Sequence, residues 1–251
     1  MTELDKLADW FEEDAWPTIS CPVCLRGDLA PVSVLPIDTG ISQRLRAHEA
    51  FEPEWIAGFF TAHLKCQRGG CDETAVALGD MKVDYSNHPD DTWDGQYATF
   101  LQLRHVLPAP PLVEVVEACP EPVRDRLNEA ALVIWSDANA AANRLRLAVE
   151  EVLDDQSIDR VAHNGHQLKT HARIERFRSK NARVADALEA VKWIGNQGSH
   201  EDSLTRADVV AGAQILAHAL ELLYDTKQEE LRRRVEVINT AKRVPRPDAR
   251  P

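Results

Sequence analysis

Four of the five cysteines form two close pairs, and this spacing is the clearest chemical signal in the sequence. Cys21 and Cys24 are separated by two residues, whereas Cys66 and Cys71 are separated by four. Thiolates presented by two tight turns are common ligands of a closed, tetrahedral Zn²⁺ site. The spacing therefore predicts a structural zinc site formed by all four thiols, because four thiolates leave no open position for a catalytic water.

Two alternatives for these residues stay open at the level of the sequence. His48 or His63 could replace one thiol as a ligand, or the four cysteines could be buried and reduced without a metal. The fifth cysteine, Cys119, stands alone before a proline and is expected to be inert. Two close pairs favour a metal site in a reducing compartment over a disulfide framework.

A second group of polar residues interrupts a helical pattern at residues 195–200, which read Gly-Asn-Gln-Gly-Ser-His. Each glycine costs about 1 kcal/mol relative to alanine in a helix, so helix stability does not explain this stretch. Lys192, Asn196 and His200 fall at i, i+4 and i+8 and would share a face if the helix continued. One interpretation is a cleft in which His200 is a general acid or base. The other is a helix C-terminus with one of the glycines as a left-handed cap.

Further charged residues are candidates to support or extend this site. Arg146 and Glu150 lie four residues apart, which predicts an ion pair within one helix that also anchors the 195–200 stretch. Residues 168–184 carry a net charge of +5, typical of a surface that contacts RNA, DNA or an acidic partner. The candidates for that contact are Lys169, Arg173, Arg176 and Lys180. A solvated helix face is the favoured alternative, because Phe177 is the only aromatic residue among them and base stacking needs aromatic side chains.

The elements that would position these residues follow from hydrophobic periodicity. Alternating patterns predict strands at residues 59–64, 74–78 and 100–107. Helical patterns predict helices at residues 2–15, 123–134, 141–152, 168–178, 182–194 and 205–243. A proline cluster at residues 108–111 marks a boundary between the two kinds of pattern.

The predicted fold class is therefore α+β, mainly α. Residues 1–110 would form an N-terminal helix and a small zinc-ribbon β module. Residues 111–226 would form a helical bundle, and residues 227–251 a charged helical extension with a disordered tail.

Charge and hydropathy exclude several classes of protein. The net charge of -12 argues against indiscriminate DNA binding. A zinc-ribbon transcription factor would need a basic ribbon, whereas residues 1–110 carry 8 basic and 18 acidic residues. No apolar stretch approaches the ~18 to 20 residues that cross a bilayer, which predicts a soluble cytoplasmic protein with no membrane partner.

The order of these features resembles a known bacterial family. An N-terminal cysteine ribbon, Arg146 four residues before Glu150, and Gly195-Asn196 four residues before Ser199-His200 are similar to a family of unassigned function. Its helical domain is also fused to type I restriction subunits and is grouped with the HEPN domains. The resemblance covers residues 120–225 and implies a HEPN-like helical bundle.

Many HEPN domains are metal-independent RNases that dimerise, so that an Arg-Asn-x-x-x-His motif from each chain lines one cleft. In this sequence Gly195 stands where the motif has arginine, and that arginine would stabilise charge on the cleaved phosphate. Lys192, one turn earlier, could supply a charge without the planar fork of a guanidinium.

The resemblance implies an accessory or effector role in bacterial defence against foreign nucleic acid. We expect a binding and interaction module whose partner is RNA or another defence protein. The alternative is an active HEPN-type RNase that uses His200, Asn196 and Lys192 in a dimer cleft. The resemblance also implies a homodimer with the two motif regions near the two-fold axis. The apolar residues available to a core and an interface are Val209, Ile215, Leu216, Leu220 and Leu223.

Overall fold

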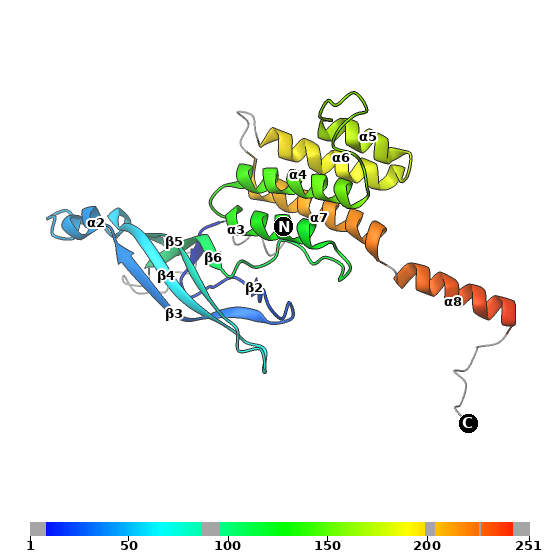
Figure 1. Cartoon of the computed structure of the whole chain (residues 1–251). Helices are drawn as coiled ribbons and strands as arrows, with labels where there is room; N and C mark the ends of the chain where they lie inside the picture. Colours follow the sequence, from blue (N-terminus) through cyan, green and yellow to red (C-terminus); the bar gives the residue numbers. More distant parts are fainter. Residues whose placement is uncertain (1–8, 87–95, 199–203, 226, 243–251) are drawn as a thin grey trace.

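The computed structural model describes residues 9–86, 96–198, 204–225 and 227–242. Within them an antiparallel sheet is followed by a bundle of helices, so the α+β class is confirmed (Figure 1). One contiguous cluster of buried side chains runs from the sheet into the bundle, with contacts between β6 (Tyr97–Leu107) and α3 (Glu121–Val133).

The sheet has six strands in the order β1-β6-β5-β4-β3-β2. The remaining bounds are β1 Phe11–Glu12, β2 Ile19–Ser20, β3 Asp28–Asp38, β4 Ala57–Cys66 and β5 Thr74–Tyr85. Along β4 and β5 alternate side chains are buried, as expected for strands with one face on a core. The three strands predicted from alternation are confirmed as β4, β5 and β6.

Strand β3 was not predicted, because Pro31 and Pro36 interrupt its sequence pattern. Proline lacks the N–H that a ladder requires and is tolerated at sheet edges and bulges. Within the described residues, strand β2 pairs only with Leu29 and Asp28, so most of β3 is an edge. The register of β3 with β4 shifts after Pro31. The β module is therefore a larger sheet than the small ribbon expected from the sequence.

The predicted N-terminal helix is wrong for the described part of its range. Phe11 and Glu12 form β1 and pair with Leu101 and Phe100 of β6, while residues 1–8 lie outside the described residues. The Trp16 ring contacts the rings of Phe11 and Phe60, at centroid distances of 5.2 and 6.1 Å. Burial of these aromatic side chains against the sheet outweighs the local helical pattern.

The helical half follows the predicted order. Besides α3, its helices are α4 Ala138–Asp155, α5 Thr170–Arg178, α6 Ala182–Gln197, α7 Arg206–Tyr224 and α8 Lys227–Ala241. Two short helices, α2 Gly40–Leu45 and η1 Pro53–Trp55, lie between β3 and β4. The predicted helix at 205–243 is divided, because Asp225 has an extended backbone between α7 and α8. Helix α8 extends away from the bundle (Figure 1), and the tail at residues 243–251 lies outside the described residues.

Capping residues fix where the central helices begin. The Asp137 carboxylate accepts a hydrogen bond from the Ala140 backbone N–H at the start of α4. At α7 the Thr205 hydroxyl accepts from the Asp208 N–H, and Asp208 accepts in return from the Thr205 N–H. A capping box is thus present with aspartate in the role that sequence rules assign to Glu or Gln.

Helix α4 is the centre of the bundle and contacts α3, α5, α6 and α7. Helix α7 passes the length and composition test for a membrane span, which the sequence pattern had not suggested. However, Val209, Leu216 and Leu220 of α7 are buried in the bundle. This face of α7 packs against α4 and α6.

Candidate functional site

The four paired cysteines converge at one end of the sheet. Their sulfur atoms all lie within 4.8 Å of one another, with Cys21 Sγ 3.8 Å from Cys71 Sγ and Cys24 Sγ 3.7 Å from Cys66 Sγ. These distances suit four ligands around one soft metal ion. The predicted four-thiol cluster is therefore confirmed, and it is compatible with metal binding.

Two turns bring the thiols together. Cys21 and Cys24 lie between β2 and β3, while Cys66 ends β4 and Cys71 lies in the turn to β5. Gly27 permits their close approach, since a Cβ there would lie 2.7 Å from Cys66 Sγ. His48 and His63 are not part of the cluster, so the alternative ligands are not needed.

The protein groups around the cluster favour one thiolate before a metal arrives. A backbone hydrogen bond from Arg26 is the main influence that lowers the pKa of Cys24 to about 6. At Cys66 the Arg68 backbone N–H favours the thiolate, but burial and the neighbouring thiols oppose it and raise the pKa to about 12. Metal binding would therefore displace protons from the cluster, and its affinity would rise with pH.

A cleft of about 750 Å³ opens in the helical half and is the main candidate binding site. Its walls come from α4, from the loop between α4 and α5, from the start of α5 and from the end of α6. The lining residues are Arg146, Glu150, Arg160, Gln167, Leu168, Lys169, Thr170, His171, Arg173, Lys192, Trp193 and Asn196. Five of these side chains are cationic and one is a carboxylate, and two carboxylates outside the lining, those of Asp154 and Glu189, also pair with cations of the wall.

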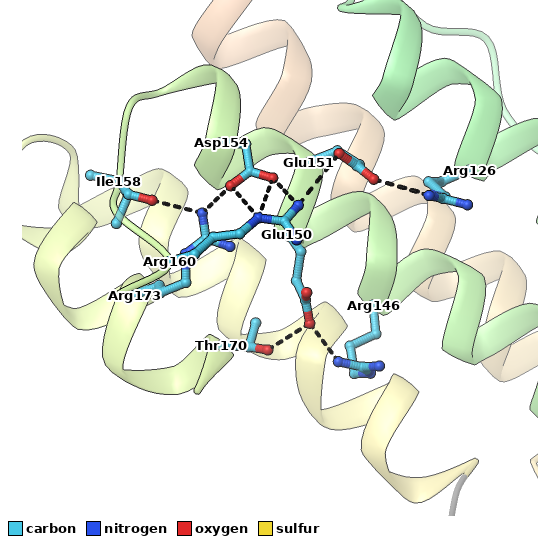
Figure 2. A network of polar contacts seen from close by, with 9 residues as sticks. All are labelled: Arg126, Arg146, Glu150, Glu151, Asp154, Ile158, Arg160, Thr170 and Arg173. Carbon is cyan, nitrogen blue, oxygen red and sulfur yellow. Dashed lines mark hydrogen bonds and ion pairs between the residues drawn. The ribbon is translucent and has the colours of Figure 1, made fainter. Parts of the chain in front are cut away.

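Glu150 connects two walls of the cleft. Its Oε1 accepts a hydrogen bond from Arg146 Nη1 at 2.6 Å and from the Thr170 hydroxyl at 2.9 Å (Figure 2). The predicted ion pair between Arg146 and Glu150 is present within α4. The extra bond to Thr170 fixes the first turn of α5 against α4.

A second network lies behind the cleft wall and is centred on Asp154. Arg173, only 2% exposed, donates from Nη2 to Asp154 Oδ1 at 2.5 Å and to the Ile158 carbonyl at 2.7 Å. Arg160 binds the same carboxylate and also lies near Glu151 (Figure 2). Hydrogen bonds from Arg160 are the main cause of a lowered pKa at Asp154, and Arg173 adds to it. Asp154 thus neutralises a guanidinium that is almost fully buried.

The α6 wall holds a buried lysine. The Lys192 ammonium lies 3.4 Å from Glu189 Oε1, 3.5 Å from His171 Nδ1 and 3.8 Å from the centroid of the Trp193 ring. Burial favours the neutral acid at Glu189, but Lys192, His171 and Arg178 outweigh it and lower the pKa of Glu189. Glu189 therefore stays ionised and compensates the buried ammonium.

His171, Glu175 and Glu189 are close enough to one another to bind a cation. A metal ion there would meet the Lys192 ammonium and the Arg178 guanidinium, which already bind these carboxylates. The group is therefore explained by ion pairs within the protein.

The first turn of α5 lines one end of the cleft. Lys169 is the N-cap residue, and among the described residues its side chain makes no capping hydrogen bond, while the first turn of α5 contains no acidic residue of its own. The first N–H groups of a helix lack partners within the helix and carry partial positive charge. In the part of the chain that the structure describes, the exposed Lys169 ammonium makes no ion pair. This end of the cleft is suited to an anionic group.

The predicted site residues are partly brought together. Lys192, Asn196, Arg146 and Glu150 line the cleft, and so do two of the basic candidates, Lys169 and Arg173. Two others, Arg176 and Lys180, do not line it. Ser199 and His200 lie outside the described residues.

The left-handed glycine cap is wrong. Helix α6 continues to Gln197, and Gly198 ends it with φ −60° and ψ −12°. Gly195 is required by packing, because a Cβ there would lie 2.5 Å from Arg146 Cβ and 2.9 Å from the Ala142 carbonyl oxygen. The glycine allows α6 to approach α4 closely, which places Asn196 and Arg146 in one cleft.

Several cleft residues belong to no motif in the sequence, and Trp193 is the most informative of them. The loop residues Arg160 and Gln167 and the α5 residues Thr170 and His171 were also missed, because no motif includes them. Phe177, the aromatic residue within the basic stretch 168–184, is 1% exposed and unavailable for stacking. The sequence does hold one signal for Trp193: this large aromatic residue falls on the polar face of its predicted helix, directly after Lys192.

Comparison with known protein families gives two matches. Residues 128–241 match the domain of unknown function DUF4145, and residues 9–105 match the domain of unknown function DUF8608. No curated protein and no solved structure matches the chain. The first match includes every residue that lines the cleft, and the second includes all four clustered cysteines. Each half of the chain is thus similar to a family whose function is unassigned.

Proposed function

We propose that this chain is an RNA-binding and interaction module whose cleft between α4, α5 and α6 holds phosphate groups. The observation that carries the proposal is the cationic lining of the cleft, in which the Lys169 ammonium lies beside the N-terminus of α5 and makes no ion pair among the described residues. Cations and helix N-termini are the usual protein groups that bind phosphates. In a protein with a net charge of -12, such a concentration of positive charge is a candidate nucleic-acid contact.

Binding is favoured over efficient catalysis by the ion pairs inside the cleft. Arg146 is neutralised by Glu150, and Lys192 by Glu189. These cations hold the walls of the cleft, and a transition-state charge would have to compete with the carboxylates for them. Gly195 also cannot be replaced by the arginine of the HEPN motif without displacing α4.

One observation favours the second candidate, a metal-independent HEPN-type RNase. The Arg146 side chain packs against Gly195, on the side where a motif arginine would point, and it also lines the cleft. Arg146 could then supply from α4 the charge that α6 lacks, with Asn196, Lys192 and His200 as further active-site residues. The lack of any cleavage of single-stranded RNA would exclude this candidate.

The proposed biological setting is bacterial defence against foreign nucleic acid, as an accessory or effector protein. Its support is the resemblance of the helical half to HEPN-like domains of defence proteins.

We also propose a structural Zn²⁺ in the four-cysteine cluster, supported by the all-thiol donor set and its closed geometry. A homodimer is supported by exposed apolar side chains on α8, namely Leu231, Val235 and Val237.

Charge reversal at Lys169 is the test of RNA binding. Lys169→Glu should weaken the binding of a short labelled single-stranded RNA by about tenfold or more, since a hydrogen bond to a charged group contributes about 1.5–3 kcal/mol. The dependence of log K on log salt should also become shallower by about 0.7 per lost phosphate contact. Fluorescence anisotropy titrations at several salt concentrations would measure both effects.

Arg176→Glu is the matched control, because Arg176 is exposed on the same helix but does not line the cleft. After correction for the change in net charge, the RNA affinity of this variant should stay within about twofold of the wild type. Equal losses in the two variants would indicate diffuse attraction and contradict a cleft site.

The RNase candidate is tested with the same RNA. Wild type, Arg146→Ala and His200→Ala would each be incubated with it in the absence of metal, and only this second candidate predicts cleavage.

A further inference from the structure

Trp193 is a large aromatic side chain that the packing of α6 against its neighbours does not bury. It is 60% exposed on α6, whereas Trp135 in the core is 2% exposed. Its ring forms part of the cleft wall beside Lys192 and Asn196. An exposed aromatic ring within a basic cleft is a common feature of proteins that stack the bases of single-stranded nucleic acids.

The surroundings of Trp193 hold its ring in place. The Lys192 ammonium lies 3.8 Å from the ring centroid, in the range of a cation–π contact, and it is itself held by Glu189. The lysine is 3% exposed, so this contact is formed from inside the protein. The exposure of Trp193 leaves ring surface open towards the cleft, where a flat group could stack.

The ring is close to the anion-binding end of the cleft. The ammonium that contacts Trp193 also lies 3.5 Å from His171 Nδ1, and His171 is in the first turn of α5. The Trp193 ring and the first turn of α5 thus border the same part of the cleft, with the Lys192 ammonium between the ring and the His171 side chain.

We propose that the cleft binds a nucleotide whose unpaired base stacks on Trp193 and whose phosphate lies at the N-terminus of α5 beside Lys169. This deepens the RNA-binding proposal above and rests on it. The base must be unpaired, because a base within a duplex is already stacked on both faces and its edges are paired. The ligand is therefore single-stranded RNA or a free nucleoside monophosphate, both of which carry this base and phosphate.

The test compares a short labelled oligouridylate with an abasic strand of the same length, which keeps the phosphates but lacks the bases. Trp193→Ala should weaken binding of the oligouridylate by about tenfold, within the range that single-base stacking contributes, and leave the abasic strand unaffected. Trp193→Phe should retain most of the affinity for the oligouridylate. Competition by uridine monophosphate distinguishes a site that accepts one free nucleotide from one that needs a strand.

Trp10→Ala is the matched control, since Trp10 is 38% exposed and has the Lys82 ammonium 5.2 Å from its ring, but lies on the sheet side of the molecule. This variant should change neither the affinity for the oligouridylate nor the affinity for the abasic strand. If Trp193→Ala weakened both strands equally or neither, stacking would be overturned while phosphate binding stood. If wild-type protein bound neither strand at low salt, both proposals would be overturned.

Discussion

Cys66→Ser is expected to remove the metal from the protein and to destabilise the cysteine end of the sheet. Elemental analysis should report about one zinc ion per wild-type chain and essentially none in the variant. Structural zinc contributes about 10–16 kcal/mol of apparent binding free energy in small zinc domains. Even a loss of about 5 kcal/mol would lower the melting temperature by roughly 10 to 20 °C in a chain of this size.

Cys119→Ala is the control for this prediction, because Cys119 is also buried but lies outside the cluster. It should retain the full metal content and lose only the small packing contribution of one sulfur atom. Wild-type protein purified without chelator that contained no metal would contradict the zinc assignment. So would an unchanged melting temperature when a chelator is added to the wild type.

Asp154→Ala is expected to have the next largest effect on folding stability. The Arg173 guanidinium, almost fully buried, would keep the Ile158 carbonyl but lose the carboxylate that neutralises it. Breaking a buried ion pair from one side costs about 3–5 kcal/mol, because a charge is left without compensation. Chemical denaturation monitored by circular dichroism would measure the change in the free energy of unfolding.

Asp186→Ala provides the comparison, since Asp186 pairs with Arg178 at the surface and its side chain is 71% exposed. Exposed pairs contribute about 0–1 kcal/mol, so this variant should remain close to the wild type. Similar losses in the two variants would contradict the special role of the buried arginine.

The pH dependence of stability gives a second measurement of the same ion pairs. Arg160 and Arg173 lower the pKa of Asp154 in the folded protein. The stability that this carboxylate contributes is therefore complete above its ordinary pKa and is lost as the pH falls through the lowered value. Asp154→Ala should lose less stability than the wild type on acidification.

The cysteine cluster could be predicted from sequence because its ligands are short-range pairs. Two residues between Cys21 and Cys24 already define a turn, and the only long-range requirement is that two turns meet. The register of β3 with β4 and of β4 with β5 satisfies that requirement. What the sequence did not predict is the size of the sheet, since the prolines of β3 and the two-residue strands β1 and β2 carry almost no periodic signal.

The cleft was only partly predictable from the sequence, because its residues come from separate helices that meet through long-range packing. Lys192 and Asn196 share a helix face by local geometry, and Arg146 and Glu150 do so on another helix. That the two faces meet depends on the close approach of α4 and α6 at Gly195. The irregular loop between α4 and α5 adds Arg160 and Gln167, and no periodicity predicts the position of such residues.

The most direct test of the central claim, that the cleft binds RNA, is photo-crosslinking of a single-stranded RNA followed by mass spectrometry of the peptides. The principal crosslinks should lie at Trp193 and at residues 167–173, and Lys169→Glu should reduce them while Arg176→Glu should not. Crosslinks confined to the sheet or to α8, with none at the cleft, would show that RNA binds elsewhere.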